Sequence, residues 1–260
     1  MFEHAPGPEP IPPRPFDSER VEGPPNTIPL GERVAAAAEV LLCSGFPTQL
    51  LIIGLLSVAG LPIRDDGGLL SSPFIFVLSL LDTVLVVGLV VLFLRARGES
   101  PRAVLLGTRH VLREAWLGVL LIPVIFVGVV VILMLIITIV PSLHNVPRNP
   151  LEDLLRTRGD AVIFGFVVMI AGGVREEVQR GFILHRFQQF LGGAVTGIVV
   201  FSVMFGAGHI EQGWDAAIAT AALGACWGIV YLVRRSIVAP MVSHAGFNLA
   251  QLAKYFVVAG

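Results

Sequence analysis

Residues 116–140 read WLGVLLIPVIFVGVVVILMLIITIV, a run of 25 residues without one charged side chain. A helix needs about 20 apolar residues to cross the hydrocarbon core of a bilayer, because each residue adds about 1.5 Å to its length. The surface of a soluble protein could not cover so long an uncharged run. This stretch therefore predicts a membrane-spanning helix.

Six further apolar segments flank it, at 34–62, 73–94, 161–187, 194–210, 216–233 and 236–257. Five of the seven segments are long enough to span a bilayer, whereas 194–210 and 216–233 are short and joined by a tight polar turn. The sequence predicts an all-α, polytopic transmembrane helix bundle of about seven spans, or eight if a short re-entrant segment is added.

The composition supports a lipid environment, since 55% of the 260 residues are hydrophobic and only 14% are charged. Soluble domains carry about 25% charged residues. The net charge of −1 gives no basic footprint for nucleic acid, so we expect no nucleic-acid partner. Two distant cysteines in apolar segments establish no disulfide framework.

Two stretches fall outside the predicted spans. Residues 1–30 are rich in proline and have no helical period, so we expect a disordered N-terminal tail followed by a single domain over 31–260. The stretch 101–115 (PRAVLLGTRHVLREA) alternates apolar and basic residues, which predicts an interfacial helix on the cytoplasmic face.

The distribution of arginines indicates the orientation in the membrane. Cytoplasmic loops are enriched in Arg and Lys, and here arginines precede the first span and fill the loop 95–113. The opposite loops hold mainly acidic residues, except 141–160, where both signs mix. We therefore expect an integral protein of a bacterial inner membrane, with a cytoplasmic N-terminus and an external C-terminus.

Polar side chains interrupt three of the apolar segments, where each ionisable group is costly and indicates a functional site. The three groups are Arg175, Glu176, Glu177 and Arg180; Phe205 and His209; and His244 and Asn248. Within them, Glu176 and Arg180, Phe205 and His209, and His244 and Asn248 are four residues apart and share a helix face. Three helices that present such pairs at comparable depth could form one polar pocket.

These residue types fit hydrolysis by an activated water. A carboxylate and a neutral imidazole can share a water, one removing its proton and the other positioning it. The second histidine and the asparagine amide can donate hydrogen bonds to the oxyanion of a tetrahedral intermediate. Arg180 would keep a neighbouring carboxylate ionised by direct charge pairing, and Phe205 would at most shape the pocket.

At these residues the chain resembles the CAAX-processing type II (CPBP/ABI) intramembrane peptidases. Their motifs are Glu-Glu-x-x-x-Arg, Phe-x-x-x-His and His-x-x-x-Asn, in that order on three spans. The second and third match at Phe205–His209 and His244–Asn248. The resemblance implies catalytic roles for Glu176, Glu177, His209, His244 and Asn248.

The first motif departs from the family pattern, because only Val178 and Gln179 separate the glutamate pair from Arg180. Alignment on the glutamates makes Glu176 the catalytic one, and we favour it. Alignment on the arginine instead puts Arg175 first and Glu176 second. Consecutive helical residues point about 100° apart, so the alignment decides which side chain meets the water.

The resemblance implies an intramembrane endopeptidase whose partners are the bilayer and membrane-anchored or lipid-modified protein substrates. Its cofactor is open: none, or a divalent metal such as zinc held by the histidines, glutamate and asparagine. The altered glutamate spacing favours an alternative, a catalytically silent scaffold or bacteriocin-immunity-type protein. A small transporter that uses Glu176 and Asp82 as proton carriers is disfavoured because inverted repeats are absent.

Overall fold

The computed structural model describes residues 28–257, so residues 1–27 of the predicted tail lie outside the described part. The described chain is mainly helical and contains no named strand. Its longer elements are α1 (Leu30–Leu42), α2 (Phe46–Val58), α3 (Ser72–Ala96), α5 (Val111–Ile139), α6 (Arg158–Val168), α7 (Glu176–Phe190), α8 (Gly193–Ala207), α9 (Trp214–Arg234) and α10 (Val238–Val257). Short elements join them: α4 (Pro101–Leu105), the 3-10 turns η2 (Pro141–Leu143), η3 (Pro150–Leu154) and η5 (Ile210–Gln212), and the π-helix η4 (Met169–Arg175).

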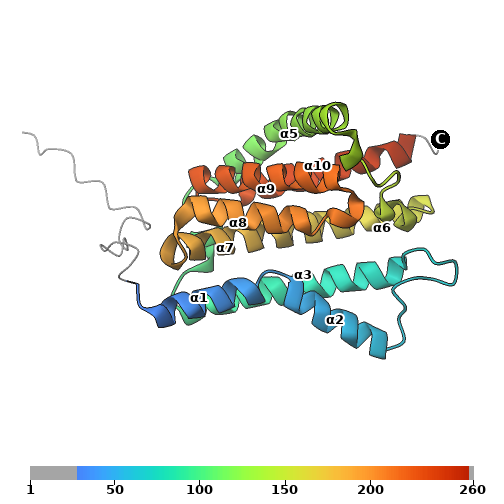
Figure 1. Cartoon of the computed structure of the whole chain (residues 1–260). Coiled ribbons are helices and arrows are strands. Elements are labelled where there is room, and N and C mark those ends of the chain that lie inside the picture. Colours follow the sequence, from blue (N-terminus) through green and yellow to red (C-terminus); the bar gives the residue numbers. More distant parts are fainter. Residues whose placement is uncertain (1–27, 258–260) are drawn as a thin grey trace, which may run out of the picture.

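The helices lie side by side in three layers (Figure 1). One layer holds α1, α2 and α3, the middle layer holds α6, α7 and α8, and the third holds α5, α9 and α10. The middle layer contacts both others, since α7 packs on α1 and α3 while α8 packs closely on α9. The candidate site residues of the middle layer thus have helices on either side of them.

Helices cover each of the seven predicted segments, and the described chain forms an all-α bundle that includes helices apolar enough for a membrane. Within the described residues, α3, α5 and α9 are each long and apolar enough to cross a bilayer. The pair α1 and α2 adds a fourth span if it is counted as one, although it bends by 43° at its break. The count of seven spans stays a prediction.

The predicted interfacial helix over 101–115 was wrong in extent. The structure has only the five-residue helix α4, and Val111 already begins α5. The two are separated at Gly107, whose φ of +64° is left-handed; a Cβ there would lie 2.1 Å from the carbonyl oxygen of Arg235 and clash with it. Val104 and Leu105 are buried, and α4 packs against α7. The apolar side of α4 therefore packs on the bundle, whereas Val111 and Leu112 at the start of α5 are exposed.

The middle layer contains one helical run that changes its winding. A capping box at Thr157 and Asp160 begins α6, because each residue accepts a hydrogen bond from the backbone N–H of the other. The run then widens into η4 before it continues as α7. Gly172 and Gly173 in η4 let α10 approach closely, since a Cβ on Gly173 would lie 2.8 Å from that of Ala245. Single π turns of this kind occur often at functional sites.

A buried ion network ties α1, α3 and α7 together at one end of the bundle. Arg186 has no exposed side-chain area and donates to Glu39 and Glu99, each at 2.5 Å. Arg97 binds the other oxygen of Glu39 at 2.7 Å, and His185 lies 2.6 Å from Glu99. These contacts join residues that are far apart in the chain and fix the register of the three helices.

Glu99 makes the network sensitive to acid. Burial opposes its charged form, but the hydrogen bond and charge of His185 and the hydrogen bonds of Arg186 and Gln189 outweigh burial, and the pKa falls from 4.5 to about 2. A depressed carboxyl pKa gives stability that is complete above the unfolded pKa and is lost as the pH falls through the folded value. We expect the thermal midpoint of the purified protein to fall between about pH 5 and pH 2, and to fall less in Glu99→Gln. Equal losses in both proteins would contradict this role of Glu99.

Candidate active site

The structure brings four of the predicted site residues to one cavity. Glu176 begins α7, His209 lies two residues beyond the end of α8, and His244 and Asn248 lie one turn apart on α10. All four border a cavity of about 480 Å³, which Phe205 also lines. Glu177 does not border this cavity. The helices predicted to converge thus do so around one cavity.

The two adjacent glutamates have different surroundings. The side chain of Glu177 is 1% exposed; its Oε1 pairs with Arg180 and accepts a hydrogen bond from Nδ1 of His244 at 2.8 Å. The side chain of Glu176 is 15% exposed and borders two cavities. Of the two carboxylates, only that of Glu176 can meet a substrate or a water that enters a cavity.

Arg180 lies fully buried in an aromatic cage. Its guanidinium carbon is 4.8 Å from the ring centroid of Phe201, 5.0 Å from Phe205 and 5.4 Å from Trp227. Such cation–π contacts stabilise a charge that has lost its water. The carboxylate that Arg180 pairs with is that of Glu177.

His244 lies between the two glutamates. Its Nδ1 bonds Glu177, while its Nε2 is 3.7 Å from Oε2 of Glu176, longer than a direct hydrogen bond. Trp227 stacks on the imidazole at 3.9 Å between centroids, and its own N–H donates to Ser243 at 3.0 Å. The ring is therefore held in one orientation, with Nε2 toward Glu176.

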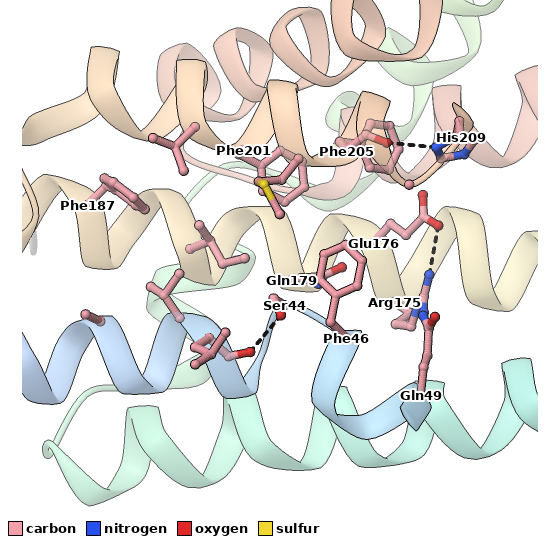
Figure 2. Close-up of a pocket in the computed structure, with 17 residues that line it drawn as sticks. Ser44, Phe46, Gln49, Arg175, Glu176, Gln179, Phe187, Phe201, Phe205 and His209 are labelled. Carbon is pink, nitrogen blue, oxygen red and sulfur yellow. Dashed lines mark hydrogen bonds and ion pairs between the residues drawn. The ribbon is translucent and has the colours of Figure 1, made fainter. Parts of the chain in front are cut away.

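His209 is oriented by the end of its own helix. Its Nδ1 lies 2.8 Å from the carbonyl oxygen of Phe205, and since a carbonyl only accepts, Nδ1 carries the proton of the neutral ring. Nε2 is then left as a hydrogen-bond acceptor. Figure 2 shows the His209 ring and the Glu176 carboxylate at the same end of a cavity. The Phe205 ring lies edge-on to both histidines, with centroids 5.1 Å from His209 and 6.3 Å from His244.

Asn248 completes the pocket opposite η4. A Cβ on Gly172 would collide with its Nδ2 and would lie 3.7 Å from Nε2 of His244. Because Gly172 has no side chain, the Asn248 amide can occupy this space. The Asn248 amide therefore depends on this close approach of η4, whereas His244 would be at ordinary contact distance.

A second cavity of about 450 Å³ reaches the same residues from the side of α1 and α2 (Figure 2). It shares Arg175, Glu176, Phe205 and His209 with the first cavity. The rest of its wall is mostly apolar, with side chains from α1, α2, α7 and α8. Glu176 and His209 therefore lie where an apolar cavity and a more polar one meet.

Three residues contribute to the site although the sequence patterns gave them no role in it. Arg175 binds Oε1 of Glu176 at 2.9 Å, and Asp82 of α3 pairs with the same arginine. A carboxylate such as Asp82 is energetically costly inside a span, but no sequence spacing predicted its partner Arg175, which lies 93 residues away. Trp227 carried no signal, because its stacking on His244 depends on the packing of α9 against α10.

The residues present do not form a metal centre. Across residues 28–257, no three His, Cys, Asp or Glu side chains are grouped so that they could hold a metal ion. Nδ1 of His244 is also engaged by Glu177.

Fold and site together define a helical membrane protein with a buried glutamate–histidine pocket. Residues 158–250 match the family model described as type II CAAX prenyl endopeptidase Rce1-like, and the three motifs lie inside this range. Over these residues the chain is similar to this protease family, and the resemblance seen in the motifs is confirmed. A search of curated proteins and a search of solved structures found no match.

Proposed function

We propose that the protein is an intramembrane endopeptidase that hydrolyses peptide bonds of membrane-anchored or lipid-modified substrates. The observation that carries the proposal is the shared cavity of Glu176, His209, His244 and Asn248. The protease family of the matched segment supports it.

In the proposed mechanism, Glu176 removes a proton from a water that Nε2 of His209 helps to position. The water attacks the scissile carbonyl, and the Asn248 amide stabilises the oxyanion; His244 adds a donor at Nε2 only when both of its ring nitrogens carry a proton, since Nδ1 already donates to Glu177. As the C–N bond breaks, the protonated Glu176 returns its proton to the leaving amine. Glu177 holds His244 through Nδ1, and Arg180 balances the charge of Glu177. Glu177 thus supports the site without contacting the substrate.

The alternative is a catalytically silent family member that serves as a membrane scaffold or immunity-type protein. The specific observation in its favour is the ion pair of Arg175 with Glu176, together with the altered motif spacing. A cation bound to the proposed base makes it a poorer proton acceptor.

The deciding experiment is cleavage of a panel of lipidated and unlipidated membrane peptides by the purified protein in liposomes. Cleavage that a strong chelator leaves intact supports a glutamate-activated water. Activity that a chelator abolishes and zinc restores would assign the same side chains to a metal site. No cleavage across the panel would favour the silent scaffold.

We also propose seven spans in a bacterial inner membrane, with the N-terminus and the 95–113 loop in the cytoplasm. The bias of arginines toward these segments supports this orientation. Five predicted spans separate residue 100 from residue 260, so reporters fused after these two positions should give opposite signals. Matching signals would contradict the topology.

A further inference from the structure

Asp82 is a buried carboxylate whose partners lie on two other segments. It has no exposed area in the middle of α3, a helix that is otherwise strongly apolar. Its Oδ1 accepts from the Thr48 hydroxyl, and its Oδ2 accepts from the Gln49 amide at 3.1 Å and from Nη1 of Arg175. A carboxylate at this depth is costly and indicates a function.

The break between α1 and α2 supplies the two neutral donors. Gly45 at the break has a left-handed φ of +86°, and a Cβ there would lie 3.5 Å from the amide nitrogens of Gln49 and Gln179 and 3.8 Å from Asp82. Gln179 in turn donates to the carbonyl of Cys43 at 2.8 Å. The bend thus turns polar groups of α2 toward α3 and α7.

Arg175 is shared between two carboxylates. Nη1 binds Asp82, and Nη2 binds Oε1 of Glu176 at 2.9 Å. A guanidinium that is free of other partners binds a carboxylate through two parallel N–H groups. Asp82 binds Nη1 and Glu176 receives one hydrogen bond from Nη2, so the two carboxylates share the charge of one cation. Its other oxygen stays directed toward His244.

We propose that Asp82 is a positioning residue that preserves the basicity of Glu176 by drawing Arg175 partly away from it. The effect of Asp82 on catalysis rests on the proposed function, but its effect on the protonation of Glu176 can be measured without catalysis. A purely structural role would need only hydrogen bonds to Asp82. The proposed role needs its negative charge.

Charged and polar groups from several elements lie near Glu176. They are Arg175 at its side, Glu177 next in α7, His244 on α10, His209 after α8 and Asp82 on α3. Glu177 is engaged by Arg180 and His244, so Asp82 and Arg175 are the pair whose balance can be changed without disturbing that contact.

The first test is the pH dependence of Glu176 labelling by dicyclohexylcarbodiimide, which modifies protonated carboxyl groups in apolar surroundings. Peptide mass spectrometry separates label on Glu176 from label on Glu177. Asp82→Asn removes the competing charge and leaves Arg175 to Glu176, so the labelling midpoint should move to lower pH by about one to three units. An unchanged midpoint in a folded Asp82→Asn protein would overturn the inference.

Matched variants separate charge from structure. Thr48→Val removes a hydrogen bond to Asp82 but no charge, so it should lower thermal stability and leave the midpoint in place. Arg175→Gln should move the midpoint to higher pH, and the double variant Asp82→Asn/Arg175→Gln should return it toward the parent value. A double variant that stays at the Asp82→Asn value would contradict a route through Arg175.

Where the parent is active, the acid limb of its kcat/KM profile should move to lower pH in Asp82→Asn, and the maximal kcat/KM should fall at least about tenfold, as expected for a weaker base. A parent that cleaves nothing refutes the proposed function, while the labelling result still decides the role of Asp82. An active parent with an unshifted Asp82→Asn profile and midpoint refutes the role of Asp82 alone.

Discussion

Glu176→Gln is expected to lower kcat/KM by about 10²–10⁴-fold, the usual cost of losing a general base. Glutamine keeps the size of the side chain and can still accept a hydrogen bond from Arg175, but it cannot take a proton. Its thermal midpoint should stay close to that of the parent, because the variant removes a partly exposed charge. Cleavage of the preferred substrate by purified protein in liposomes measures the loss.

A matched control is Glu32→Gln, which neutralises a carboxylate that is 51% exposed and borders neither cavity. Its activity should equal that of the parent. Full activity in Glu176→Gln would dismiss the assignment of the base, and full activity in both glutamate variants of the motif would dismiss the mechanism.

Glu177→Gln is expected to act on stability first. The Arg180 side chain has no exposed area, and its Nε and Nη2 have no hydrogen-bond partner in the described part of the chain. Removing one member of a buried ion pair typically costs about 3–5 kcal/mol, because the remaining charge is left uncompensated. Nδ1 of His244 would also lose its charged acceptor. Equilibrium unfolding in mixed detergent micelles measures the loss.

The double variant Glu177→Gln/Arg180→Met tests the reason for this loss. Replacing both members of a buried pair by neutral groups is often far less costly than removing one. The double variant should therefore be more stable than Glu177→Gln alone. A Glu177→Gln protein that unfolds like the parent would show that the ion pair does not hold α7 in place.

The sequence predicted a helical membrane bundle and four residues that border one cavity, because both predictions depend on local patterns. Uncharged runs such as 116–140 predict helices in lipid, and the spacing of His244 and Asn248 places them on one face. The match of residues 158–250 to a protease family agrees with the motif order.

The different surroundings of Glu176 and Glu177 could not be read from the sequence. Their directions depend on the phase of α7, which the π-helix η4 sets just before Glu176. A π turn shifts every following side chain around the helix axis, and the residue types in Met169–Arg175 do not predict such a turn. Motif alignment alone therefore left the two glutamates unresolved.

Long-range partners were equally hidden. Asp82 finds Arg175 only because α3 packs beside η4, and the bend at Gly45 adds donors from α2. The error at 101–115 has a similar cause, since an amphipathic pattern fits a bundle surface as well as a membrane surface.

The most direct test of the central claim compares Glu176→Gln and Glu177→Gln side by side, with cleavage rate per folded molecule and unfolding measured on the same preparations. The structure predicts that Glu176→Gln keeps the unfolding midpoint of the parent and loses cleavage. It predicts that Glu177→Gln loses stability. A stable but inactive Glu177→Gln beside a fully active Glu176→Gln would contradict the assignment of Glu176 as the base.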